Sequence, residues 1–129
     1  MLTKLPLSLN SPSQDQEFTA VINAAQENPF CDMATGIGNA VLTLRDGELC
    51  IALSYVGLSS PELFSHIHGP ADVGENGDVI FPLSMGPNKM DCFELTRKEQ
   101  RELKRGLWYF NIHSENCPPG EIRGQILPM

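Results

Sequence analysis

Short runs of alternating apolar and polar residues, separated by turn-forming residues, recur along the 129-residue chain. Phe18, Ala20 and Ile22 show the two-residue period of a β-strand with one buried face. Asp46-Gly47 lies between the runs at 36–45 and 48–56, and this dipeptide favours the positive φ angles of a tight hairpin turn. Further strands are predicted at 63–68, 78–83, 107–113 and 121–127. About seven short strands with turns between them predict an all-β sandwich or barrel.

One short helix is expected to interrupt this pattern. Thr96 and Glu99 have the spacing of a capping box, and residues 100–105 are good helix formers. Gly106 lies where a helix C-terminus is expected. The prediction is therefore an antiparallel β-sandwich with one short helix.

The N-terminal region differs from the rest of the chain. Residues 1–16 end in a polar, turn-rich stretch and predict a flexible tail before a single domain over 17–129. Pro6 and Ser8 interrupt the leucines near the N-terminus, whereas a secretory signal peptide needs about 7 to 15 continuous apolar residues. No signal peptide is predicted in this chain.

Charge and hydropathy exclude two classes of partner. Nine Lys and Arg against 16 Asp and Glu give a formal net charge of −7, which repels phosphate backbones and anionic lipid. No apolar run approaches the roughly 20 residues that a membrane helix needs. We therefore expect neither nucleic-acid binding nor membrane insertion.

The four cysteines leave two interpretations open. Cys31, Cys50, Cys92 and Cys117 form an even set that allows two disulfides in any of three pairings in an oxidising compartment. No pair has the C-x-x-C spacing of a zinc ribbon or a thioredoxin-like site. In a reducing cytosol the same residues would be small buried hydrophobes.

The three histidines carry the strongest chemical signal. His66 and His68 form an H-x-H pair on one predicted strand, and side chains at i and i+2 share a face at about 6.6 to 7 Å along the strand. His113 ends another predicted strand and would complete a set of three. Three neutral imidazoles with an open position suit zinc or copper, and the affinity order of divalent ions favours copper. The alternatives are solvated or hydrogen-bonded side chains, and a pH-sensing cluster.

Other polar residues are candidates for supporting roles. Asn111 shares a strand face with His113 and is expected to orient it. Glu121 and Arg123 share a face and are expected to form a partly buried ion pair. An additional ligand would come from Asn111, Glu121, Glu115, Met85, Met90 or water. No nucleophile signature or phosphate-binding loop is present, and no catalytic residue is assigned.

Two longer motifs resemble the CHRD family, whose domain was first described in chordin. They are HIHGPA at 66–71 and GLWYFNIHSENCPPGEIRGQ at 106–125. The residues at 25–29, 38–42 and 95–106 are also similar, so the resemblance spans about 17–127. It implies an immunoglobulin-like, exported all-β domain whose biochemical role is poorly defined.

A more distant similarity concerns copper/zinc superoxide dismutase, which also holds copper with an H-x-H strand and a later histidine on a β-sandwich. By this analogy, His66, His68 and His113 match the copper ligands. No fourth histidine is present to bridge a second metal, so the implied site is mononuclear. The chain departs from the CHRD pattern at Cys31 and Cys117, and these two sulfurs form our hypothesis for one disulfide.

Three hypotheses about function follow. The first is a non-enzymatic, mononuclear copper-binding domain, with zinc as the alternative metal, that handles or senses metal outside the cytoplasm. The second is a structural or protein-interaction module whose partner is another protein. The third is a copper redox enzyme similar to superoxide dismutase.

Overall fold

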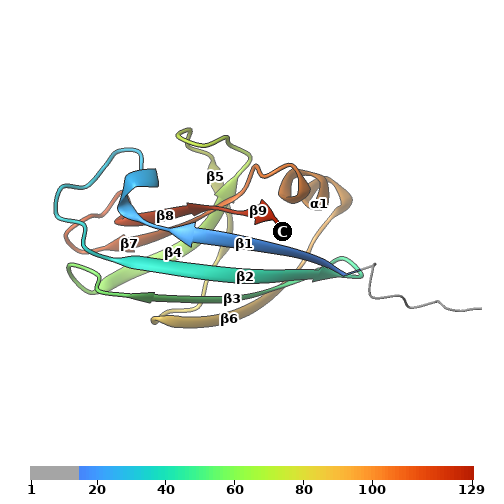
Figure 1. The fold of residues 1–129 in the computed structure, drawn as a ribbon, viewed down its shortest axis with the longest axis horizontal. Helices are drawn as coiled ribbons and strands as arrows, with labels where there is room; N and C mark the ends of the chain where they lie inside the picture. Colours follow the sequence, from blue (N-terminus) through green and yellow to red (C-terminus); the bar gives the residue numbers. More distant parts are fainter. Residues whose placement is uncertain (1–14) are drawn as a thin grey trace, which may run out of the picture.

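The computed structural model describes residues 15–129, which form two packed antiparallel β-sheets (Figure 1). The first sheet has the strand order β6-β3-β2-β1-β9 and the second has β5-β4-β7-β8. The strands of the first sheet are β1 (Gln16–Ile22), β2 (Ile37–Arg45), β3 (Glu48–Val56), β6 (Asn88–Glu94) and β9 (Leu127–Pro128). Those of the second are β4 (Glu62–Gly69), β5 (Asp78–Pro82), β7 (Tyr109–Ser114) and β8 (Ile122–Gln125). Two short helices, η2 (Ala24–Gln26) and α1 (Arg97–Lys104), complete the fold. The two sheets confirm the predicted β-sandwich.

The hydrophobic core lies between the two sheets. Phe18, Ala20 and Ile22 are buried as the alternation predicts. Ile67 and Phe110 face them from the second sheet, and both belong to the same buried cluster. Burying an aliphatic or aromatic side chain of this kind contributes about 1.5–3 kcal/mol, so the core fixes which face of each strand points outward.

Both predicted local motifs are present. Asp46 and Gly47 have φ angles of 50° and 80°, as a tight hairpin between β2 and β3 requires. Thr96 caps α1, and the reciprocal bonds with Glu99 complete the capping box at 3.1 and 2.8 Å. α1 has eight residues. No helix within residues 15–129 is long and apolar enough to cross a membrane.

The strand prediction needs two corrections. β6 was not predicted, because buried Lys89 and half-buried Asp91 occupy inward positions and break its apolar alternation. The predicted strand at 121–127 is two strands. β8 and β9 belong to different sheets, and the chain passes between them at Ile126, which is fully buried and donates its N–H to the carbonyl of Trp108.

The predicted N-terminal tail is only partly described. Gln16 already belongs to β1, and the Asp15 carboxylate accepts hydrogen bonds from Arg45. The rest of the predicted tail, 1–14, lies outside the described residues.

All four cysteines form disulfides. Cys31 pairs with Cys117, as hypothesised, and joins the segment before β2 to the connection between β7 and β8. Cys50 pairs with Cys92 and joins β3 to β6. Two disulfides are typical of proteins from an oxidising environment.

Candidate metal site

The strand register gathers the three histidines on the outer face of the four-stranded sheet. Across β4 and β7, Phe64 lies opposite His113, His66 opposite Asn111, and His68 opposite Tyr109. β8 extends two of these rows with Arg123 and Gln125. Ile67 and Ile112 point the other way, into the core. The H-x-H spacing and the β4–β7 pairing therefore place all three imidazoles together.

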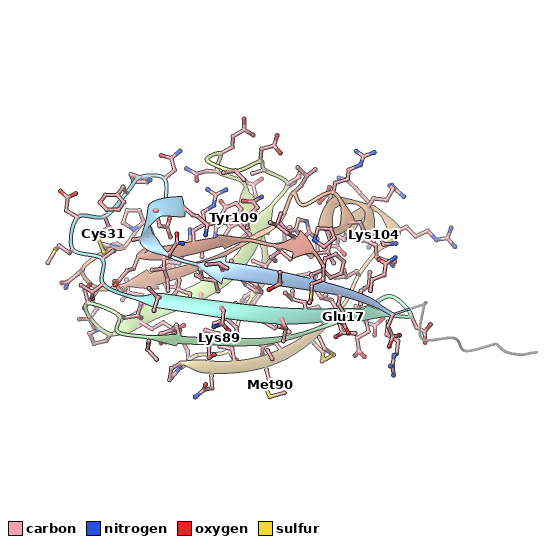
Figure 2. The ribbon with its side chains drawn as sticks, in the orientation of Figure 1. Glu17, Cys31, Lys89, Met90, Lys104 and Tyr109 are labelled. Atoms are coloured by element: carbon pink, nitrogen blue, oxygen red, sulfur yellow. A yellow bond between two sulfur atoms is a disulfide. The ribbon has the colours of Figure 1, made fainter. Side chains whose placement is uncertain are left out.

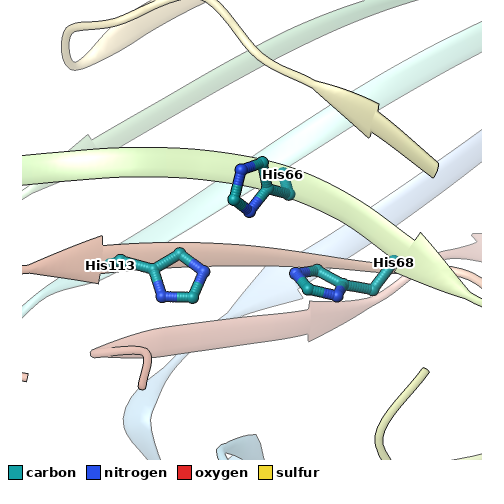
Figure 3. A group of neighbouring side chains, drawn as sticks. All are labelled: His66, His68 and His113. Carbon is teal, nitrogen blue, oxygen red and sulfur yellow. The ribbon is translucent and has the colours of Figure 1, made fainter. Parts of the chain in front are cut away.

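The imidazole rings converge as the sequence predicts (Figure 3). One ring nitrogen from each of His66, His68 and His113 lies within 4.8 Å of those of the other two. The ring centroids of His66 lie 5.4 Å from His68 and 5.3 Å from His113, and those of His68 and His113 are 6.2 Å apart. This spacing allows one small ion to contact all three residues.

Hydrogen bonds to backbone carbonyls orient two of the three rings. His68 Nδ1 lies 3.0 Å from the Gly77 oxygen, and His113 Nδ1 lies 2.8 Å from the Pro118 oxygen. A carbonyl only accepts, so each Nδ1 carries the proton and each Nε2 keeps a free lone pair. These two Nε2 atoms and His66 Nδ1 are buried without a hydrogen-bond partner. Buried polar atoms normally have partners, and a metal ion would satisfy all three nitrogens at once.

The electrostatics of the site favour neutral imidazoles. Burial lowers the pKa of each of the three histidines below its ordinary value. For His66 the neighbouring rings of His113 and His68 lower the pKa further, because two imidazolium charges would repel. At neutral pH the lone pairs are therefore available to a metal without prior loss of a proton.

Aromatic side chains flank the histidines. The Phe64 ring centroid lies 4.5 Å from that of His113 and 5.1 Å from that of His66. Tyr109 stacks on His68 at 5.1 Å with an interplanar angle of 7°. Tyr109 was not predicted as a site residue, although the two-residue period from His113 puts it on the same strand face.

Loops cover this face of the sheet. Every residue of β7 and β8 is buried, although only alternate side chains point into the core. The connection between β4 and β5 contributes carbonyl oxygens of Ala71 and Asp72, which accept bonds from Gln125 and Arg123 at 2.8 and 3.1 Å. The histidines therefore lie in a polar layer between the sheet and its loops.

Glu27 belongs to this polar layer and was not predicted as a site residue. It lies just after η2 and is 7% exposed, and its Oε2 has no hydrogen-bond partner. Gly120, with φ of +138°, allows the close approach, because a Cβ there would lie 2.6 Å from this Oε2 and 2.4 Å from Asn111 Oδ1. In the sequence Glu27 belongs only to the segment 25–29 that resembles the CHRD family, and no local pattern indicates that it folds over the sheet.

Asn111 lies on the predicted face, but it makes no hydrogen bond to His113. Its Oδ1 is buried without a partner, and the Pro118 carbonyl orients His113 instead. The predicted orienting role of Asn111 is therefore wrong, because the turn after β7 places the Pro118 carbonyl oxygen, and not the Asn111 amide, beside His113 Nδ1.

Of the predicted additional ligands, Glu115 is not among the residues grouped with the three histidines, and both methionines are exposed. Glu115 is exposed, and its side chain is not part of the nitrogen cluster. Met90 is 83% exposed on the outer face of the other sheet, on the opposite side of the molecule from Tyr109 (Figure 2). Met85 is 59% exposed in the connection between β5 and β6.

Glu121 has a structural environment of its own, and the predicted ion pair with Arg123 is wrong. Its fully buried carboxylate accepts bonds from the N–H groups of Thr35, Gly36 and Ser59 at 2.9 to 3.0 Å. The hydroxyls of Ser59 and Ser114 add bonds of 2.8 and 2.6 Å. These donors occupy the carboxylate and tie three segments of the chain together.

Glu121 should make the stability of the fold depend on acid. Burial alone would raise the pKa of this carboxyl, but the bonds from Ser114, Thr35 and Ser59 together hold it below its ordinary value. The ionised form therefore stabilises the fold above the unfolded pKa of about 4.3, and this contribution disappears as pH falls through the lower folded pKa.

We expect Glu121→Gln to lower the free energy of unfolding at pH 7 by about 1.5–3 kcal/mol, because charge-assisted hydrogen bonds are lost. The variant should also lose less stability than the wild type between neutral and acid pH. Urea denaturation from pH 7 to pH 3 measures both effects, with exposed Glu17→Gln as the control. Equal acid dependence in Glu121→Gln and the wild type would contradict the prediction.

The fold and this cluster define a class of protein: a two-sheet antiparallel sandwich with three histidines on the outer face of one sheet. The CHRD domain family model matches residues 18–126, nearly the whole chain. The chain belongs to the CHRD family. Neither the curated proteins nor the solved structures include one that matches it.

Proposed function

We propose that this CHRD domain binds one copper ion through His66, His68 and His113. The observation that carries the proposal is the set of three converging, buried ring nitrogens without hydrogen-bond partners. Copper would use those lone pairs as ligands, and the carbonyls of Gly77 and Pro118 would fix the tautomers from the far side of two rings.

The donor set supports copper over other metals. Imidazole nitrogens suit copper and zinc, and copper binds more tightly to a given nitrogen site. No carboxylate of residues 15–129 lies among the three nitrogens, which disfavours the oxygen-seeking ions magnesium and calcium. Zinc is the alternative metal.

We assign the domain to metal handling or sensing outside the cytoplasm. The two disulfides support an oxidising, extracytoplasmic location. A domain that carries or senses copper needs only to bind the ion and does not need to catalyse a reaction. Bound copper also has an accessible redox couple, so assays of superoxide and peroxide turnover would separate handling from catalysis.

His113→Ala should abolish the binding of one copper ion per chain. The reason is that it removes one of three ligands, and β7 has no second imidazole to replace it. Elemental analysis of untagged protein, followed by copper and zinc titration of the stripped form, measures the stoichiometry. Exposed Glu115→Gln, in the turn after His113, is the matched control and should bind as the wild type does.

Thermal or urea denaturation provides a second readout. Copper at 100 times its dissociation constant should stabilise the wild type by about 2.7 kcal/mol and leave His113→Ala unchanged. Unchanged stoichiometry in His113→Ala would refute the ligand assignment. No binding of either metal to the wild type would favour a structural or protein-interaction module.

A further inference from the structure

A buried arginine lies beside the candidate copper site. Arg123 is 1% exposed, and its guanidinium donates to Asn76 Oδ1, the Asp72 carbonyl and Gln125 Oε1 at 3.1 to 3.3 Å. All three acceptors are neutral, and its Nε has no partner. Within residues 15–129, Arg123 makes no salt bridge. A full positive charge is therefore buried here without an ion-pair partner.

Aromatic stacking connects this charge to one of the proposed ligands. The guanidinium carbon of Arg123 lies 3.6 Å from the centroid of the Tyr109 ring. Tyr109 in turn stacks in parallel on His68 at 5.1 Å. A single aromatic ring, that of Tyr109, therefore lies between the Arg123 guanidinium and the imidazole of His68.

The nearby carboxylates compensate this charge only in part. Burial raises the pKa of Glu27 to about 7, against the opposing effect of Arg123, so Glu27 carries less than a full negative charge at neutral pH. Asp78 precedes Val79, the cross-strand partner of His68, but Asp78 is exposed and its field is screened by water and salt.

We infer that the site selects monovalent copper over divalent ions, and that Arg123 is the residue that sets this preference. Three neutral imidazoles add no negative charge, so the charge of Arg123 opposes a divalent ion about twice as strongly as a monovalent one at the same position. Copper(I) also accepts three nitrogen ligands without a fourth. This inference rests on the proposed copper site and specifies the ion that it holds.

The midpoint potential of bound copper tests the inference. One electron from the electrode converts bound copper(II) to copper(I), and the potential reports the ratio of the two affinities. Arg123→Gln removes the charge and should lower the preference for copper(I) by about tenfold, a fall of about 59 mV for a one-electron couple. Arg123→Lys keeps the charge and should stay within about threefold of the wild type, or about 28 mV.

Each outcome has a defined meaning. An unchanged potential in Arg123→Gln would overturn the inference. Equal shifts in Arg123→Gln and Arg123→Lys would also overturn it, because they would show that packing rather than charge sets the potential. Failure of the wild type to bind copper in either oxidation state would refute the proposed function itself, which is a separate result.

Glu27→Gln tests the electrostatic preference for copper(I) if the Arg123 variants do not fold. The substitution keeps the shape of the side chain and removes its partial negative charge, so the preference for copper(I) should rise and the midpoint potential with it. A potential that stays constant or falls in folded Glu27→Gln would overturn the inference. Circular dichroism of each variant confirms that the folded protein is being compared.

Discussion

Lys89→Met is expected to destabilise the fold by about 3–5 kcal/mol, because it leaves a buried carboxylate without its cation. Lys89 Nζ lies 2.6 Å from Glu62 Oε2, and the two side chains are 0% and 4% exposed. The pair links β6 of one sheet to β4 of the other. Tyr55 and Gly86 donate to the second carboxylate oxygen at 2.6 and 3.0 Å, so the whole group is held in place. Urea denaturation at pH 7 measures the loss.

Two further variants separate the ion pair from general packing. Lys89→Met combined with Glu62→Gln should be more stable than Lys89→Met alone, because a neutral amide leaves no unpaired charge in the interior. Lys98→Met is the exposed control. Its ion pair with Glu102 spans 3.9 Å on the surface of α1, and its loss should change stability by less than about 0.5 kcal/mol. Equal effects of Lys89→Met and Lys98→Met would contradict the prediction.

The same ion pair explains why one strand escaped prediction. An inward Lys89 looks like a surface residue in the sequence, since its partner Glu62 lies 27 positions earlier. Only the tertiary contact makes this position suitable for burial. The strands around Leu42 and Ile51 were predictable because each buries an apolar side chain at every second residue, which needs no knowledge of the partner strand.

The candidate site was likewise predictable in one part and not in the other. The H-x-H spacing places His66 and His68 on one face by strand geometry alone. The pairing of β4 with β7, which brings His113 to them, is a long-range property that the residues do not encode locally. The position of His113 at the end of a predicted strand led to the expectation that it joins them, and the similarity to superoxide dismutase pointed to the same three residues.

The contacts of Glu121 and Arg123 could not be predicted from their spacing in the sequence. Glu121 has the right spacing for an ion pair, yet its carboxylate binds backbone N–H groups of Thr35 and Gly36, more than 80 residues away in sequence. Arg123 instead stacks on Tyr109 and donates a hydrogen bond to the 70–77 loop. Both outcomes depend on where loops fold over the sheet, and loop paths have no periodic signal.

Loss of the Cys31–Cys117 disulfide should lower both stability and copper affinity. Its ends are 86 residues apart, so the chain-entropy model gives a loss of roughly 4.5 kcal/mol in Cys31→Ser/Cys117→Ser. Pro118, the residue after Cys117, accepts the hydrogen bond that orients His113. Loosening this turn frees the ring, and disruption of such a supporting bond weakens metal binding by about 10–100-fold. Chelator competition on the folded variant measures the affinity.

The second disulfide is a control with a similar effect on stability. Cys50 and Cys92 are 42 residues apart, which corresponds to roughly 4 kcal/mol in the same model. They join β3 to β6 in the other sheet, away from the histidines, so Cys50→Ser/Cys92→Ser should keep the copper affinity of the wild type. Equal losses of affinity in the two variants would show that copper binding follows global stability. A loss confined to Cys31→Ser/Cys117→Ser would show that the turn carrying Pro118 controls the site, so that reduction of this one disulfide weakens copper binding.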